Sequence, residues 1–93
     1  MTAATPTFTK ALVTILAEND VRRVTTDDDG YVAVVVGVYY DNAMAGHFTA
    51  RTRSLFTRIA GELRHYSLFH HDSKMDDYDG DDFDAVEVWI FSR

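Results

Sequence analysis

The sequence predicts an α+β domain spanning residues 1–93, in which two helices pack on one face of a four-stranded, mostly antiparallel sheet. The predicted element order is α-β-β-α-β-β. Two segments repeat apolar residues every three or four positions, which is the spacing of a buried helix face. Each is followed by two segments rich in β-branched and aromatic residues, which is typical of strands. A chain of 93 residues has the size of one domain, and no linker interrupts it.

The first helix is predicted to begin at Pro6 and to end near Glu18-Asn19-Asp20. Thr5 is a suitable N-cap, and the missing N–H of proline costs nothing at the first helical position. The predicted buried stripe consists of Phe8, Ala11, Leu12, Ile15 and Leu16.

Two strands are predicted next, over residues 21–26 and 31–40. The turn between them, 27–30, ends in Gly30, which can adopt the positive φ of a short hairpin. The second strand is apolar on both of its alternating faces. Such a strand is usually central in a sheet and covered on both sides.

A second helix is predicted from about Ala43 or Phe48 to about His65. Its apolar stripe consists of Phe48, Thr52, Leu55, Phe56, Ile59 and Leu63. Arginines flank the stripe at Arg51, Arg53, Arg58 and Arg64. We interpret them as compensating carboxylates within the molecule, because they do not cluster on one exposed face as a phosphate-binding site requires. Strands over 66–71 and 85–92 complete the sheet, joined by a long acidic connection over 72–84.

The motifs of catalysis and metal binding are missing from the sequence. It has no cysteine, no Gly-rich phosphate loop and no Gly-x-Ser-x-Gly nucleophile. An EF-hand centred on Gly80 fails, since Met75 and Val86 occupy the positions that need carboxylates. His70 and His71 are adjacent on a predicted strand, so they point to opposite faces. We therefore expect no enzyme activity, no catalytic residue, no metal site and no cofactor.

The charge balance constrains the partners. Nine basic against fifteen acidic residues give a formal charge of −6. A surface this acidic repels nucleic acid and anionic membranes, so we expect no direct binding to either and favour a protein partner with a basic surface. No run of about 20 apolar residues and no signal peptide is present, so the expected location is the cytoplasm.

Acidic residues concentrate in two loops, which are the first predicted partner-binding surface. The carboxylates are Asp76, Asp77, Asp79, Asp81, Asp82 and Asp84 in the long connection, with Asp27, Asp28 and Asp29 at the hairpin turn. Such a surface can steer onto a basic groove that normally holds nucleic acid. Tyr78 and Phe83 are candidate anchors within the longer loop.

The second predicted surface is a sheet face. If the valines Val32, Val34 and Val36 and the residues Val86, Val88 and Ile90 face the helices, four aromatic residues face away. These are Tyr31, Tyr39, Trp89 and Phe91. Exposed contiguous aromatic residues typically form an interface, either with a partner or in a homodimer.

Together these features favour a small acidic inhibitor that blocks a basic nucleic-acid-binding site on a partner enzyme. Its size and acidity are of the kind seen in phage and mobile-element inhibitors such as anti-CRISPR and antirestriction proteins. This is an analogy of type and not a sequence resemblance. The alternative is a homodimeric structural or assembly protein that associates through the aromatic sheet face.

Overall fold

The computed structural model describes residues 6–42, 47–78, 80 and 82–93, and it confirms the predicted α+β class. Its elements, in chain order, are α1 (Pro6–Leu16), β1 (Val21–Thr26), β2 (Val32–Val38), β3 (Tyr40–Asn42), β4 (His47–Phe48), α2 (Ala50–Arg64), β5 (Phe69–Asp76) and β6 (Ala85–Ser92). In this described part of the chain, one antiparallel sheet has the strand order β1-β2-β6-β5. Strands β3 and β4 form a separate two-stranded sheet.

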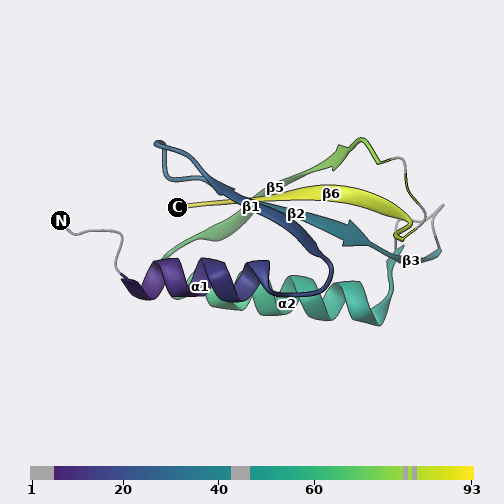
Figure 1. Ribbon diagram of the computed structural model, residues 1–93, viewed down its shortest axis with the longest axis horizontal. Coiled ribbons are helices and arrows are strands. Elements are labelled where there is room, and N and C mark those ends of the chain that lie inside the picture. The colour runs from purple at the N-terminus through teal and green to yellow at the C-terminus, as the bar shows by residue number, and fades with distance from the viewer. Residues whose placement is uncertain (1–5, 43–46, 79, 81) are drawn as a thin grey trace.

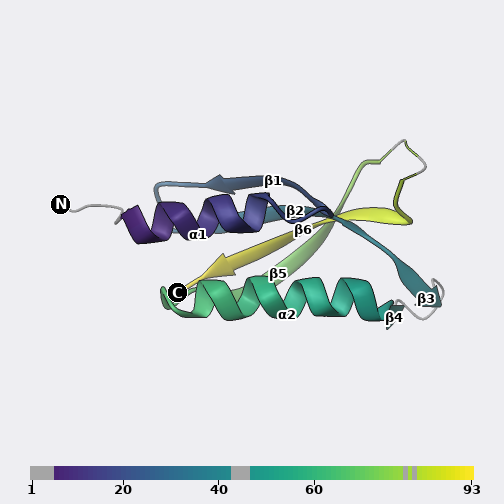
Figure 2. The same cartoon turned by 60° about the horizontal axis from the view of Figure 1, so that its bottom comes forward.

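Both helices lie on the same side of the four-stranded sheet, as predicted (Figure 1). Rotation of the view separates α1, which runs along β1, from α2, which lies under β5 and β6 (Figure 2). We call the side covered by the helices the inner face and the opposite side the outer face.

The two helices follow their apolar stripes with one correction: Phe48, predicted as the first residue of the second stripe, lies in β4 and pairs with Tyr40, so α2 starts later than predicted. Ala11 and Ile15 of α1 are buried, although Leu16 at the end of the stripe is exposed. Helix α2 begins at Ala50 because the hydroxyl of Thr49 accepts the N–H of Thr52 at 3.3 Å and so caps the first turn. Its buried residues are Thr52, Leu55, Ile59 and Leu63.

The turn between β1 and β2 is built by Asp27 and Gly30. One carboxylate oxygen of Asp27 accepts the backbone N–H groups of Asp29 and Tyr31, each at 3.0 Å. Gly30 has φ of 89°, the left-handed conformation that the sequence predicts for it. The hairpin is therefore closed by local chemistry.

The prediction that Trp89 and Phe91 face away from the helices is wrong. Trp89 lies opposite Val34 and Phe91 opposite Val32, and all four side chains belong to the inner core. Trp89 is 1% exposed and Phe91 is fully buried. The physical reason is volume: large rings fill the gap between helix and sheet, whereas the smaller Val86, Val88 and Ile90 alternate with them and so lie on the outer face.

The structure also corrects two boundaries of the predicted elements. Strand β5 spans Phe69–Asp76 instead of 66–71, so the first five residues of the predicted acidic connection pair with β6. As an edge strand that is exposed along its whole length, β5 lacks the alternating pattern by which strands are recognised. The chain after Val38 does not simply break at Asp41-Asn42, because Tyr40 pairs with Phe48 in the small second sheet.

Candidate interaction surfaces

The two acidic segments lie at opposite ends of the sheet. The turn that contains Asp27, Asp28 and Asp29 is at the end of the molecule near the C-terminus, and the loop between β5 and β6 is at the other end (Figure 1). Antiparallel pairing of β2 with β6 and of β6 with β5 produces this separation. The two segments therefore form two distinct acidic surfaces instead of one.

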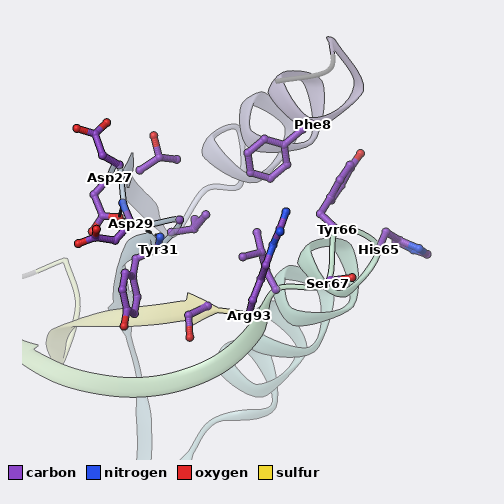
Figure 3. Close-up of a pocket in the computed structure, with 14 residues that line it drawn as sticks. Phe8, Asp27, Asp29, Tyr31, His65, Tyr66, Ser67 and Arg93 are labelled. Atoms are coloured by element: carbon purple, nitrogen blue, oxygen red, sulfur yellow. Dashed lines mark hydrogen bonds between the residues drawn. The ribbon is translucent and has the colours of Figure 1, made fainter. Parts of the chain in front are cut away.

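The hairpin end borders an open cleft of about 890 Å³. Asp27, Asp29 and Tyr31 lie on one side, with Phe8, His65 and Tyr66 on the other and Arg93 between them (Figure 3). Tyr31 is 38% exposed, and its ring meets the edge of His71 at a centroid distance of 6.2 Å. Of the four aromatic residues predicted for the sheet face, Tyr31 is exposed, Tyr39 is half-buried, and Trp89 and Phe91 are buried.

In the acidic loop at the other end, residues 77–84, hydrogen bonds with tyrosine hydroxyl groups hold the backbone of Asp82 and Phe83. The Tyr78 hydroxyl accepts the N–H groups of Asp82 and Phe83 at 2.7 and 3.2 Å. The Tyr39 hydroxyl donates to the carbonyl oxygen of Asp82 at 2.8 Å. Among the predicted carboxylates, Asp76, Asp77, Asp82 and Asp84 are exposed, whereas Asp79 and Asp81 lie outside the described residues.

Tyr78 and Phe83, the predicted partner anchors, pack onto the protein's own sheet. Both are half-buried, and the Phe83 ring lies against Gly37, where any side chain would collide with it. The Arg22 guanidinium lies 5.5 Å from the centre of the Tyr78 ring and 5.8 Å from that of Phe83. This arrangement is a cation–π contact with both rings. The pair thus holds the loop in place on the outer face.

Two arginines of α2 pair with carboxylates near the end of α1, as the sequence interpretation proposes. Arg51 donates to both oxygens of Asp20 at 2.7 and 2.8 Å, and Arg58 does the same to Glu18 at 3.0 and 3.2 Å. The hydrogen bond to Asp20 raises the pKa of Arg51 above its ordinary value. Arg51 also lies 4.9 Å over the ring of Tyr39, which explains why Tyr39 is half-buried. These arginines are internally compensated.

A third feature, missed by the sequence predictions, is a pocket of about 440 Å³ between α2 and the inner face. Its aromatic walls are Phe48, Phe56 and Trp89, and Glu87 also lines it. Glu87 accepts the Trp89 indole N–H at 3.0 Å and the Tyr40 hydroxyl at 2.8 Å. A signal was present in the sequence, because Glu87 stands two residues before Trp89 and therefore shares its face.

The bond to Glu87 predicts an unusual titration for Tyr40. Burial, together with the adjacent Glu87 carboxylate, raises the pKa of Tyr40 from 10.0 to about 12. Because the unfolded chain releases this proton first, the stability contributed by the neutral phenol is complete below pH 10.0 and is lost as pH rises toward 12. The tyrosinate absorbance of the wild type minus that of Tyr40→Phe is expected to titrate near 12. A difference curve centred near 10.0 contradicts this.

Comparisons with known proteins identify no matching family, no similar curated protein and no similar solved structure. Within the described residues, no three histidine, aspartate or glutamate side chains come together in a group that could hold a metal ion. Neither helix in that part of the chain is long and apolar enough to cross a membrane. The features left for a functional argument are the two acidic ends of the sheet and the pocket in which the Glu87 carboxylate lies among aromatic rings.

Proposed function

We propose that this protein is a small acidic inhibitor that acts in the cytoplasm by inserting its β5–β6 loop into a basic, nucleic-acid-binding groove of a partner enzyme. The observation that carries the proposal is the fastening of that loop. Carboxylates held close together repel one another, so an acidic loop tends to spread unless contacts oppose it. Here Tyr78 and Tyr39 hold the backbone of Asp82 by hydrogen bonds, and Arg22 stacks on the rings beneath.

A fastened loop is better suited to binding than a freely moving one. Part of the ordering entropy is already lost before the partner arrives, so less is lost on association. Tyr78 and Phe83 support the proposal because they pack against each other and against the sheet, and so hold the loop in position. They do not act as exposed anchors for the partner.

The distribution of charge supports the same proposal. Arg51 and Arg58 are neutralised on the helix side, where they pair with Asp20 and Glu18. The segment 72–87, which covers the end of β5, the loop and the start of β6, holds seven aspartates and one glutamate against one lysine. This end of the molecule therefore carries a local excess of negative charge that can steer it toward a basic surface. The proposal includes a phage or mobile-element origin, because inhibitors from these sources are of the same small, acidic type.

The proposal predicts a strongly salt-dependent association. The partner is captured from a host lysate and identified by mass spectrometry. Its association and dissociation rates with this protein are then measured by surface plasmon resonance. The association rate is expected to fall as ionic strength rises, because the attraction is long-range and screened. Replacing Asp76, Asp77, Asp79, Asp81 and Asp82 by Asn together should weaken binding markedly, since each exposed charge alone contributes under about 1 kcal/mol.

A matched control separates the two acidic ends. The double variant Asp77→Asn with Asp82→Asn and the double variant Asp28→Asn with Asp29→Asn remove equal charge from opposite ends of the sheet. We expect only the first pair to slow association markedly and nucleic acid to compete for the partner. Equal effects from both pairs, or unchanged binding by the five-residue variant, contradict the proposed loop mechanism.

The alternative function, a homodimeric assembly protein, has its own readout. Part of the outer face is aliphatic, with Ala33, Val88 and Ile90 half-buried on the side that neither α1 nor α2 covers. Two results together would favour this alternative over the inhibitor: a stable dimer in analytical ultracentrifugation, and no basic partner captured from the lysate.

A further inference from the structure

The carboxylate of Glu87 lies in the aromatic pocket between α2 and the inner face. Glu87 is 9% exposed, yet its two hydrogen-bond donors, Tyr40 and Trp89, are both neutral groups. The two ion pairs among the described residues join Arg51 to Asp20 and Arg58 to Glu18, and neither involves Glu87. A buried carboxylate is normally accompanied by a cation, because its desolvation is costly.

The hydrogen-bonding capacity of this carboxylate is only half used. Two oxygens offer about four acceptor positions, and Tyr40 and Trp89 occupy one position on each oxygen. Since Glu87 is itself one of the residues that line the pocket, a bound ligand can reach the remaining positions.

The walls of the pocket suit a positive charge as well. Phe56 meets Trp89 edge-to-face at a centroid distance of 5.0 Å, and Phe48 lies 6.3 Å from Trp89. Aromatic rings attract cations through their negative faces, most strongly where water is excluded. A carboxylate combined with aromatic walls is a recognised arrangement for organic cations.

We propose that this pocket binds an organic cation of the guanidinium or primary-ammonium class, with Glu87 accepting its N–H groups and the rings of Phe48, Phe56 and Trp89 packing around it. A metal ion is a poorer occupant. His70 lines the pocket together with Glu87, but the described residues contain no group of three or more acidic or histidine side chains that could hold a metal ion. The proposal does not depend on the acidic loop or on its partner.

Arg53 is the residue that opposes this proposal most directly. It also lines the pocket, and one of its guanidinium nitrogens donates to the Phe48 carbonyl oxygen at 3.0 Å. It forms no ion pair with Glu87 within 4.0 Å, so it does not neutralise that carboxylate by contact. As a like charge at the same site, it is expected to lower the affinity of a cation without abolishing it.

The site carries its own reporter, because Trp89 is the chain's one tryptophan. Methylguanidinium and methylammonium are titrated into the full-length protein while the tryptophan fluorescence is recorded, with N-methylurea as the uncharged analogue of the first probe. We expect a saturable change with at least one cation and none with N-methylurea at the same concentration. An absent or non-saturable response to both cations, or an equal response to N-methylurea, overturns the proposal.

Two variants test the assigned roles. Glu87→Gln keeps the shape and can still accept the Trp89 N–H. It is expected to weaken cation binding by roughly tenfold or more, because a hydrogen bond to a charged carboxylate is stronger than one to a neutral amide. Arg53→Gln removes the opposing charge and should tighten binding about threefold. Equal binding by a folded Glu87→Gln variant, or weaker binding by Arg53→Gln, contradicts the assignment. If Glu87→Gln does not fold, the Arg53→Gln result decides.

The natural source of the cation is a free small molecule or an arginine side chain of a protein. Comparison of methylguanidinium with Nα-acetyl-arginine amide and with a short arginine-containing peptide distinguishes them. Binding that strengthens with the attached backbone identifies a protein side chain, whereas equal affinities identify the free cation. Failure of the acidic-loop experiments leaves these small-probe results unaffected, so the two proposals fail separately.

Discussion

Trp89→Ala is expected to lower the free energy of unfolding by about 3–5 kcal/mol, the range typical of large aromatic truncations in cores. Trp89 is buried between α2 and the inner face, where it contacts Phe56 and donates its indole N–H to Glu87. The variant loses the packing of the ring and also leaves a buried carboxylate with one donor fewer. Because a domain of this size has a total stability of only about 5–15 kcal/mol, the effect is a large fraction of the whole.

Phe69→Ala provides the matched control for Trp89→Ala. Phe69 is also aromatic and also lies in the four-stranded sheet, but it is 49% exposed on the edge strand β5. Its truncation is expected to change stability by about 0.5 kcal/mol or less. Urea denaturation followed by circular dichroism measures both variants. A Trp89→Ala protein that keeps wild-type stability and instead loses association with a partner would show that Trp89 acts as a surface anchor.

Thr52→Val is expected to lower the free energy of unfolding by about 1–3 kcal/mol, the cost of an unsatisfied buried polar group. Thr52 is fully buried on α2, and its hydroxyl oxygen accepts the backbone N–H of Tyr39 at 3.0 Å. Tyr39 stands between β2 and β3, so this bond ties the end of the central strand to the helix. The Thr52 hydroxyl oxygen also accepts the Thr49 hydroxyl at 3.3 Å. Valine has nearly the same shape as threonine, so the loss reports these two hydrogen bonds and not packing.

Thr57→Val is the control for Thr52→Val. It makes the same chemical change on the same helix at an exposed position, where a shift within about 0.5 kcal/mol is expected. Faster amide hydrogen exchange at Tyr39 in Thr52→Val, but not in Thr57→Val, locates the effect. Valine and threonine have nearly equal helix propensities, so equal stability losses in the two variants would show that the hydrogen bond to Tyr39 is not the cause.

The sequence by itself determined which segments form helices and where the main strands lie. The stripe on α2 predicts its buried residues because a helix presents every third or fourth side chain to one side, whatever the rest of the fold does. The turn at Gly30 is equally local, since only the glycine backbone adopts that φ without strain. The last strand likewise lies where its alternating pattern predicts.

The candidate site was less accessible from sequence. Asp27, Asp28 and Asp29 stand at a hairpin end that the sequence predicts, but their distance from the second acidic loop depends on strand order. The extension of β5 into Asp72–Asp76 was invisible, because an exposed edge strand imposes no apolar alternation on its residues.

Only the tertiary structure decided which face of β6 is the inner one. Alternation in a strand defines two faces but does not say which of them meets the helices. The glutamate among Trp89 and Phe91 favoured solvent for that face, and the opposite face was entirely aliphatic. In the fold, the space between α2 and the sheet requires the larger side chains, and Glu87 is held there by the hydroxyl of Tyr40 and the indole of Trp89. Packing volume and a hydrogen-bond partner 47 residues away in the chain are properties of the assembled core, so no local pattern carries them.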